Sequence, residues 1–179
     1  MRTKLLAAAA LLAVTFVAAA QERPQIGLGI GIVPFAVPAA GAATVSRTVE
    51  LYVPIAVTPQ LRLEPSFGIS TDDQPGAGTD TRDFTLGLGA FVVTRIAPTA
   101  DMYVGGRLRL NFAKISNPAA SDTGTDLQIA AALGGEYYFV PRFSLGLEGE
   151  LGLFQNSRVS GDNDGVFTTG TAFLRVYFK

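Results

Sequence analysis

The sequence has 179 residues, 48% of them hydrophobic and 16% charged, and its formal net charge at pH 7 is −1. It contains no cysteine and no histidine, which excludes disulfides, thiol catalysis and histidine metal sites. The balanced charge lacks the basic excess of a nucleic-acid-binding protein, so we expect no nucleic-acid partner.

Residues 1–20, MRTKLLAAAALLAVTFVAAA, have the pattern of a secretory signal peptide. Arg2 and Lys4 provide the positive start, an apolar run follows, and three alanines precede the expected cleavage site. The run is short for a transmembrane anchor. We therefore predict removal of a signal peptide after Ala20, which leaves residues 21–179 as one domain with a net charge of −3.

Eight segments of the remaining chain alternate between apolar residues and charged or small residues, which is the pattern of half-buried β-strands. Each is near or above the ~9–11 residues that a tilted strand needs to cross a bilayer. No helical period appears after the signal. The expected strands are residues 25–34, 46–57, 61–70, 83–96, 102–115, 126–139, 143–154 and 166–178.

The connections between these segments alternate in length. Three are tight turns that contain proline, and four are longer and rich in Gly, Ala, Ser, Asp and Pro. The turns are residues 58–60, 97–101 and 140–142, and the loops are residues 35–45, 71–82, 116–125 and 155–165. An even number of strands with turns at one end and loops at the other is typical of an outer-membrane barrel, with periplasmic turns and extracellular loops.

The two faces of each strand differ in composition. In LGLEGELGL, residues 145–153, the four leucines share one face, and Glu148 and Glu150 share the other with glycines. Glycine on a water-exposed strand face weakens the strand and covers nothing. In an eight-stranded barrel, however, the lumen is only wide enough for side chains to fill, and small residues make room for long ones. We therefore predict that the leucines face lipid and the glutamates face a polar interior.

The charged residues of the inner faces form a predicted lumen network. Arginine suits such confined sites because its planar fork pairs with carboxylates, and buried charges require partners. The predicted members are Glu50, Arg62, Glu64, Arg107, Arg109, Glu136, Glu148, Glu150 and Arg175. Outward aromatic residues near both strand ends suggest interfacial girdles. Pro65 lies inside the third expected strand and cannot donate to the ladder, which predicts a bulge or a strand boundary there.

The chain resembles the small outer-membrane β-barrels of the OmpA/OmpX type in its signal, its eight strands, its loop asymmetry and its final stretch GTAFLRVYF. In that stretch Gly170, Leu174, Val176 and Phe178 share one face, as in the carboxy-terminal signal that the outer-membrane assembly machinery reads. Lys179 departs from the usual aromatic end. The resemblance implies an all-β, eight-stranded antiparallel up-and-down transmembrane barrel in the Gram-negative outer membrane. Membrane lipids and the assembly machinery would be its partners, and a monomer is expected.

Two motifs invite a catalytic interpretation that we do not adopt. Glu148 and Glu150 lie two residues apart, a backbone separation of ~6.6 Å that overlaps glycosidase carboxylate spacings, yet a filled lumen admits no sugar. Residues 27–31, GLGIG, lack the strand–turn–helix context of a dinucleotide site. The enzymes among the outer-membrane barrels that this chain resembles use a histidine, and this sequence has none. We predict no catalytic residue, no cofactor and no enzyme activity.

Acidic loop residues leave one question open. Residues 161–165, GDNDG, offer closely spaced oxygen ligands but lack the glutamate that completes an EF-hand loop, and tight-turn chemistry explains the same letters. Asp72, Asp73 and Asp80 are most simply a solvated acidic loop. We predict no metal site and leave calcium binding by these loops open.

Three functions fit the sequence. The first is a non-enzymatic outer-membrane protein that supports envelope integrity or presents its loops to an extracellular ligand. The second is a narrow porin-like channel for ions or small solutes. The third is a soluble secreted, lipocalin-like barrel with its apolar face turned inward around a ligand.

Overall fold

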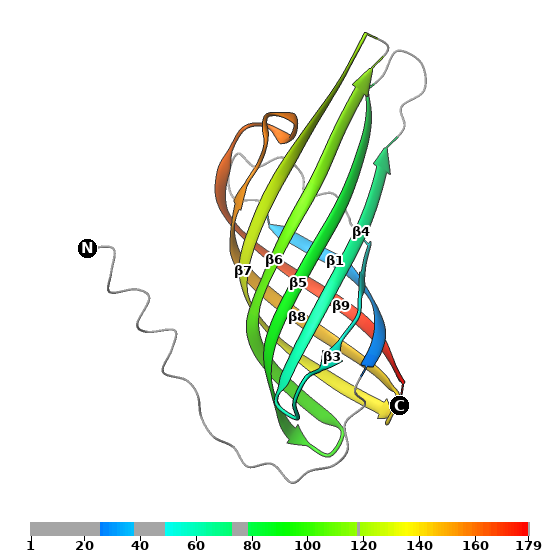
Figure 1. Cartoon of the computed structure of the whole chain (residues 1–179). Helices are drawn as coiled ribbons and strands as arrows, with labels where there is room; N and C mark the ends of the chain where they lie inside the picture. The colour runs from blue at the N-terminus through cyan, green and yellow to red at the C-terminus, as the bar shows by residue number, and fades with distance from the viewer. Residues whose placement is uncertain (1–25, 38–48, 73–78, 118, 179) are drawn as a thin grey trace, which may run out of the picture.

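The computed structural model describes residues 26–37, 49–72, 79–117 and 119–178, and for residues 32–37 and 72 it describes the backbone only. The predicted signal peptide, residues 1–20, lies outside these ranges. The described chain forms one closed barrel of tilted strands (Figure 1). No helix among these residues is long and apolar enough to cross a membrane.

Nine β-segments and one short 3-10 helix make up the described chain. They are β1 (Ile26–Val37), β2 (Val49–Tyr52), β3 (Ile55–Ala56), β4 (Leu61–Asp72), β5 (Asp80–Ala97), β6 (Ala100–Asn117), β7 (Ala120–Val140), β8 (Phe143–Gln155), η1 (Arg158–Ser160) and β9 (Asp164–Phe178).

All strand pairings are antiparallel, and β1 pairs with β9 to close the ring. β2 and β3 both lie between β1 and β4, so together they form the second of eight strand positions. The predicted eight-stranded up-and-down barrel is therefore confirmed. Closure leaves no edge strand, which is what a sheet inside a bilayer requires.

The second strand position is interrupted at Val53 and Pro54, beside Pro65 of β4. The Val53 amide donates to the Pro65 carbonyl, and the Gly27 amide donates to the Pro54 carbonyl, both at 2.9 Å. In an antiparallel sheet, the N–H and C=O groups of one residue point toward the same neighbouring strand. The Pro65 carbonyl faces Val53, so the bond that Pro65 cannot donate would also have gone to this interruption. β4 and β5 stay in register, with Pro65 opposite Leu88. The irregularity predicted at Pro65 thus lies on the neighbouring strand.

The short turns lie at one end of the barrel as predicted, whereas residues 38–45 and 73–78 of two predicted loops lie outside the described residues. Short turns join β3 to β4, β5 to β6 and β7 to β8 at the end where β1 begins and β9 ends (Figure 1). At the other end, the prediction of a long loop over residues 116–125 is wrong. β6 and β7 continue as a ladder to Asn117 opposite Ala120. Both faces of this hairpin tip carry polar residues, so the apolar alternation ends there although the strands do not.

The outer surface of the barrel is apolar and its interior is polar. Leu147 and Ile69 are each 67% exposed, whereas Glu64 and Arg175 are fully buried. None of the predicted outward apolar residues whose side chains are described is buried. A few aromatic side chains, such as Phe91 and Phe173, lie inside, but the leucines and isoleucines of the predicted outer face do not. The lipid-facing assignment is therefore confirmed, and the soluble, lipocalin-like alternative is wrong.

Outward aromatic residues gather near both ends of the barrel. At the turn end, the Tyr137 ring lies 5.3 Å from the Phe139 ring, which lies 5.9 Å from the Phe143 ring, centroid to centroid. At the loop end, the Phe84 and Phe112 rings stack at 6.3 Å. These are the positions expected of aromatic girdles at the two surfaces of the bilayer.

Candidate functional site

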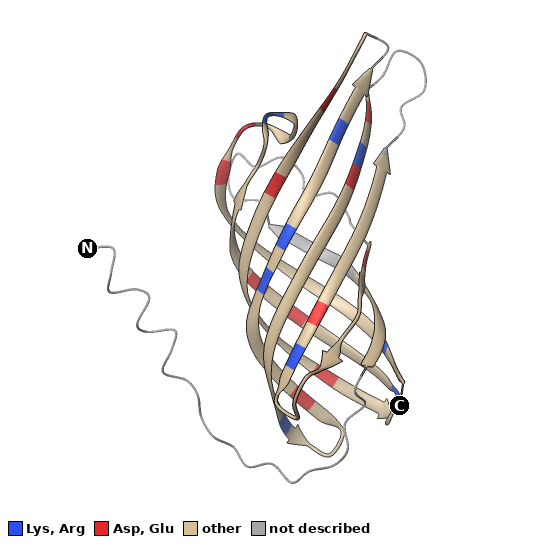
Figure 2. Cartoon of the chain, viewed as in Figure 1, with Lys and Arg blue, Asp and Glu red and all other residues tan. Residues whose placement is uncertain are grey.

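The structure brings all nine predicted lumen charges together inside the barrel. They project from six elements, β2, β4, β6, β7, β8 and β9, and Figure 2 shows charged residues on these strands through the middle of the barrel. Each is at most 7% exposed. Period-two alternation places them there, because residues two apart on a strand face the same side.

Two arginines, Arg62 and Arg175, lie toward the turn end of the network. Arg175 Nη1 donates to Glu136 at 2.9 Å, and its Nη2 donates to Glu64 at 2.6 Å. Arg62 Nη1 donates to the same Glu136 carboxylate at 2.8 Å. Two arginines therefore share two carboxylates, from strands far apart in the sequence.

Toward the loop end, two further arginines continue the network. Arg107 donates from Nε and Nη2 to Glu148, and from Nη2 to Glu64. Arg109 donates to both Glu150 oxygens, at 2.6 and 2.7 Å, and from Nε to Glu50 at 2.8 Å. Arg107 Nε also lies 3.6 Å from Glu150. This contact links Arg107 to the carboxylate that Arg109 holds, and the bond from Arg107 to Glu64 joins the loop end of the network to the turn end.

Hydroxyl groups that the sequence analysis did not single out complete the network. Tyr52 donates to Glu50 at 2.6 Å, and Tyr103 donates to Glu148 at 2.8 Å. Tyr177 and Ser144 both donate to Glu136. All four share strand parity with predicted lumen charges, so the same alternation identifies them. A carboxylate that accepts several such bonds keeps its charge at low cost inside a protein.

Another ion pair, with a buried aspartate and a half-buried arginine, lies at the turn end, beyond the predicted network. Asp101 is 1% exposed and accepts a hydrogen bond from Arg95 Nε at 3.2 Å. Asp101 is the second residue of β6, beside the turn that follows β5, where the strand alternation gives only a weak signal. The sequence analysis missed it for this reason.

Aromatic rings fill the space between the charges. The Arg175 guanidinium carbon lies 3.8 Å from the Phe173 ring centroid, and that of Arg62 lies 4.4 Å from the Tyr103 ring. Such cation–π contacts strengthen when water is excluded. Glycines give the rings their room, since a Cβ at Gly146 would overlap the Phe173 ring. The lumen is thus packed with side chains rather than open.

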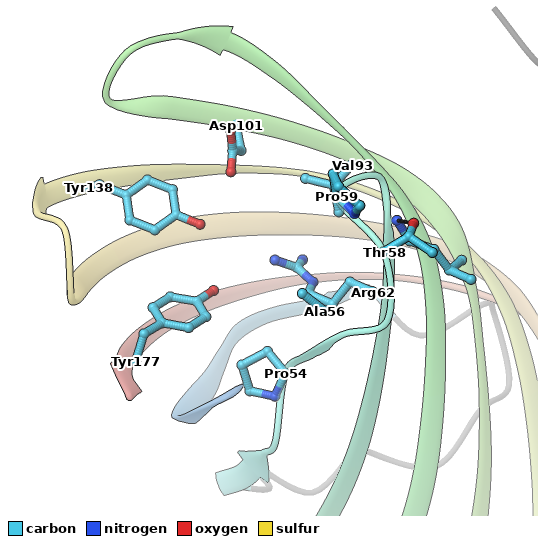
Figure 3. Close-up of a pocket in the computed structure, with 10 residues that line it drawn as sticks. Pro54, Ala56, Thr58, Pro59, Arg62, Val93, Asp101, Tyr138 and Tyr177 are labelled. Carbon is cyan, nitrogen blue, oxygen red and sulfur yellow. Dashed lines mark hydrogen bonds between the residues drawn. The ribbon is translucent and has the colours of Figure 1, made fainter. Parts of the chain in front are cut away.

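A small pocket remains at the turn end of the lumen (Figure 3). Arg62, Asp101, Tyr138 and Tyr177 line its polar side, and Pro54 belongs to its apolar side. Its cavity volume of about 20 Å³ is enough for about one water molecule. No sugar or lipid fits there, and Glu148 and Glu150 are held by arginines, so the geometry gives no catalytic pair access to a substrate.

The profile of one protein family, the outer membrane protein beta-barrel domain, matches residues 5–175. The chain belongs to this family. It is therefore a multi-pass protein of the bacterial outer membrane, with its short turns in the periplasm and its longer connections outside the cell.

Solved structures of this outer-membrane fold are similar to the chain. Ail, the attachment invasion locus protein of Yersinia pestis, is 16% identical with a TM-score of 0.59, over 87% of this chain and 98% of Ail. Neisserial surface protein A is 17% identical with a TM-score of 0.60, over 86% and 96% of the two chains. The amino-terminal barrel of Pseudomonas aeruginosa OprF is 12% identical with a TM-score of 0.58, over 88% and 100%. These likenesses show the fold. No curated protein matches the sequence.

The extracellular end of this barrel holds one well-bonded carboxylate. Asp126 of β7 is 4% exposed. It accepts hydrogen bonds from the Ser157 amide and hydroxyl and from the Ser160 hydroxyl, each at 2.7 Å, and from Asn111 Nδ2 at 3.1 Å. These bonds fasten η1 and its flanking residues to the inner side of the β6–β7 hairpin.

The acidic motifs of the extracellular loops do not form a metal cluster among the residues that the structure describes. Gly161 and Asp162 have positive φ angles of 110° and 50°, which fits the turn interpretation of residues 161–165. Asp80 is the first residue of β5. The Asp72 side chain and Asp73 lie outside the described residues, and calcium binding stays open.

The predicted assembly signal lies on β9. Leu174, Val176 and Phe178 point outward, with 41–50% of each residue exposed, and Gly170 precedes them on the same face. Lys179 lies outside the described residues. Recognition of this end by the assembly machinery remains a prediction.

Proposed function

We propose that this outer-membrane barrel is a non-enzymatic, non-conducting membrane anchor that presents its extracellular hairpins and loops to partners outside the cell. The packed lumen carries the proposal. Four arginines hold carboxylates that project from other, non-adjacent strands, and aromatic rings fill the spaces between them. A channel needs a continuous water path, which such packing opposes. A closed wall leaves the two ends as the parts that meet other molecules.

The shape of the extracellular end supports surface presentation. β5, β6 and β7 are the longest strands, at 18, 18 and 21 residues, and they rise together beyond the other strands (Figure 1). Their ladder continues five residue pairs beyond Phe112, from Ala113 opposite Gly124 to Asn117 opposite Ala120. A related fold gives a precedent, since Ail has been crystallised with the heparin analogue sucrose octasulfate. The ligand of the present chain is not identified by that likeness.

Conductance separates the proposal from the narrow-channel alternative. The refolded barrel, inserted in planar bilayers, should give no discrete current steps under voltages at which a large porin conducts in the same apparatus. Reproducible unitary steps from the wild-type barrel would establish the channel instead.

Surface presentation is tested by labelling whole cells, which the absence of native cysteine makes simple. A membrane-impermeant maleimide should label Ala119→Cys at the β6–β7 tip and leave Pro98→Cys in the β5–β6 turn unlabelled until the cells are lysed. If only Pro98→Cys were labelled in intact cells, the barrel would have the opposite orientation in the membrane, and the basis for surface presentation would be lost.

A further inference from the structure

Two basic residues face each other on the outer surface of the barrel, at its extracellular end. Arg82 of β5 is directly opposite Lys114 of β6, and both side chains are exposed. Figure 2 shows basic residues on these two neighbouring strands near their upper ends. Like charges at opposite positions of a ladder destabilise the pair. Arg82 has another interaction of its own, so the positive charge left to favour an anionic occupant is chiefly that of Lys114.

Two hydroxyl groups extend this pair to four neighbouring strands. Thr71 of β4 is opposite Arg82, and Thr123 of β7 is opposite Lys114. Both threonines are exposed on the same outward side. The four side chains thus form one transverse row of hydrogen-bond donors. Among the residues that the structure describes, Lys114 has no ion pair or hydrogen bond.

The position of the row relative to the membrane identifies the kind of occupant. The adjacent outward row on the membrane side contains Ile69, Phe84 and Phe112, again on neighbouring strands. These residues are 67%, 41% and 42% exposed, and the two phenylalanine rings stack. The donors therefore lie directly above an apolar band, at the height of lipid headgroups in the outer leaflet. On the far side of the row, Asp80 is opposite Ser116.

We propose that the row Thr71, Arg82, Lys114 and Thr123 binds the phosphate of an anionic lipid in the outer leaflet. The guanidinium and the ammonium supply charge-assisted hydrogen bonds to phosphate oxygens. The apolar row below receives the upper part of the acyl chains. A free phosphate would use the donors but not that apolar row, so the lipid is the occupant that matches both rows.

Native mass spectrometry of the full barrel in detergent tests this site, with phosphorylated lipid A as the probe and enzymatically dephosphorylated lipid A as its control. The double variant Arg82→Gln/Lys114→Gln should bind phosphorylated lipid A about 30-fold more weakly, since each basic residue near a membrane surface is worth about fivefold. Lys114→Arg should retain binding. Heat-modifiable gel migration checks that each variant is folded.

A matched control removes a basic residue from the same end but not from this row. Arg158 is paired with Asp122, and its side chain is 80% exposed. Arg158→Gln should leave lipid binding within about twofold. Unchanged binding in the double variant, an equal loss in Arg158→Gln, or equal binding of dephosphorylated lipid would overturn the site. Displacement of the lipid by millimolar inorganic phosphate would make it a soluble-phosphate site and overturn the lipid assignment.

Discussion

Arg109 of β6 and Glu150 of β8 form two parallel hydrogen bonds across the lumen, at 2.6 and 2.7 Å. β7 lies between these strands in the sheet, so the pair joins next-nearest strands through the lumen instead of direct neighbours. The same guanidinium donates to Glu50 of β2. The planar guanidinium of arginine donates hydrogen bonds to two carboxylates at once, and the ammonium group of lysine does not reproduce that geometry.

Arg109→Lys should therefore destabilise the barrel although it keeps the charge. The variant loses at least one buried bond, which costs about 1–3 kcal/mol, while Arg109→Leu leaves two carboxylates without their partner and costs about 3–5 kcal/mol. Urea unfolding in lipid vesicles measures both. Arg158→Lys, at the exposed pair with Asp122, should change stability by less than about 0.5 kcal/mol. Equal effects of the two lysine substitutions would contradict a special role for the lumen fork.

Asp126 should control the order of the segment around η1. Asp126→Ala removes the acceptor of four hydrogen bonds, three of them from Ser157 and Ser160. We expect the amides of residues 157–160 to exchange with deuterium at least about tenfold faster, a change that corresponds to about 1.4 kcal/mol of local opening. Asp122→Ala, which removes only the exposed partner of Arg158, is the control. Unchanged exchange in Asp126→Ala would show that other contacts hold the segment.

The bilayer explains why so much of this fold is predictable from the sequence. A spanning strand must be apolar outside and polar or small inside, so every crossing repeats the same period-two signal. Glu148 and Leu147 could be assigned to opposite sides from nine residues of sequence. Outside the membrane that requirement ends. The β6–β7 ladder near Asn117 is polar on both faces, and it was mistaken for a loop.

The contacts inside the lumen are less predictable, because the alternation shows which side chains point inward but not which residues they bind. The sequence indicates that Arg175 points inward. It does not indicate that this guanidinium joins Glu64 and Glu136, on strands that lie 111 and 39 residues away. The interruption at Val53 and Pro54 was also hidden, because a proline in one strand shifts the irregularity to its neighbour. Such features depend on the register between strands, which the composition of a single strand does not determine.

Signal processing should produce a defined amino terminus. The pattern of residues 1–20 predicts cleavage after Ala20, so the protein in the outer-membrane fraction should begin at Gln21. Intact-mass measurement of that fraction distinguishes this terminus from an uncleaved chain. Replacing three alanines at the site, Ala18→Phe, Ala19→Phe and Ala20→Phe, should leave the precursor uncut. A wild-type protein recovered with Met1 in place would refute the signal prediction.

The end of β9 should direct assembly. Phe178 is outward and 50% exposed, so Phe178→Ala removes little from the packed interior. We nevertheless expect a lower yield of folded barrel and more degraded or periplasmic protein, because the aromatic end is the feature that the assembly machinery reads in similar barrels. Deleting Phe178 and Lys179 together should act alike, and deleting Lys179 alone should do little. Equal folded yield for all three, measured by heat-modifiable migration, would show that this end carries no assembly signal.

The orientation of β8 is tested at two adjacent residues with opposite surroundings. Leu147 is 67% exposed near the middle of the strand, whereas Glu148 is 4% exposed and held by Arg107 and Tyr103. Leu147→Arg should reduce folding stability in bilayers by about 2–4 kcal/mol, the cost of a lipid-facing arginine at the midplane. Glu148→Gln keeps the shape and one acceptor, so it should cost less, although loss of the carboxylate from Arg107 can raise the cost to a few kcal/mol.

Spin labels at the same two positions give a test that does not depend on stability. A label on Leu147→Cys should collide with oxygen dissolved in the lipid and be shielded from polar relaxation agents, because its side chain leaves the barrel. A label on Glu148→Cys should lose that lipid contact, because the lumen around it is filled by Arg107 and Tyr103. In a closed barrel, pairing with the two neighbouring strands fixes which residues of each strand face inward. A reversed pattern at this one pair would therefore reverse the inside and outside of the whole barrel, and with it the packed lumen on which the non-conducting role rests.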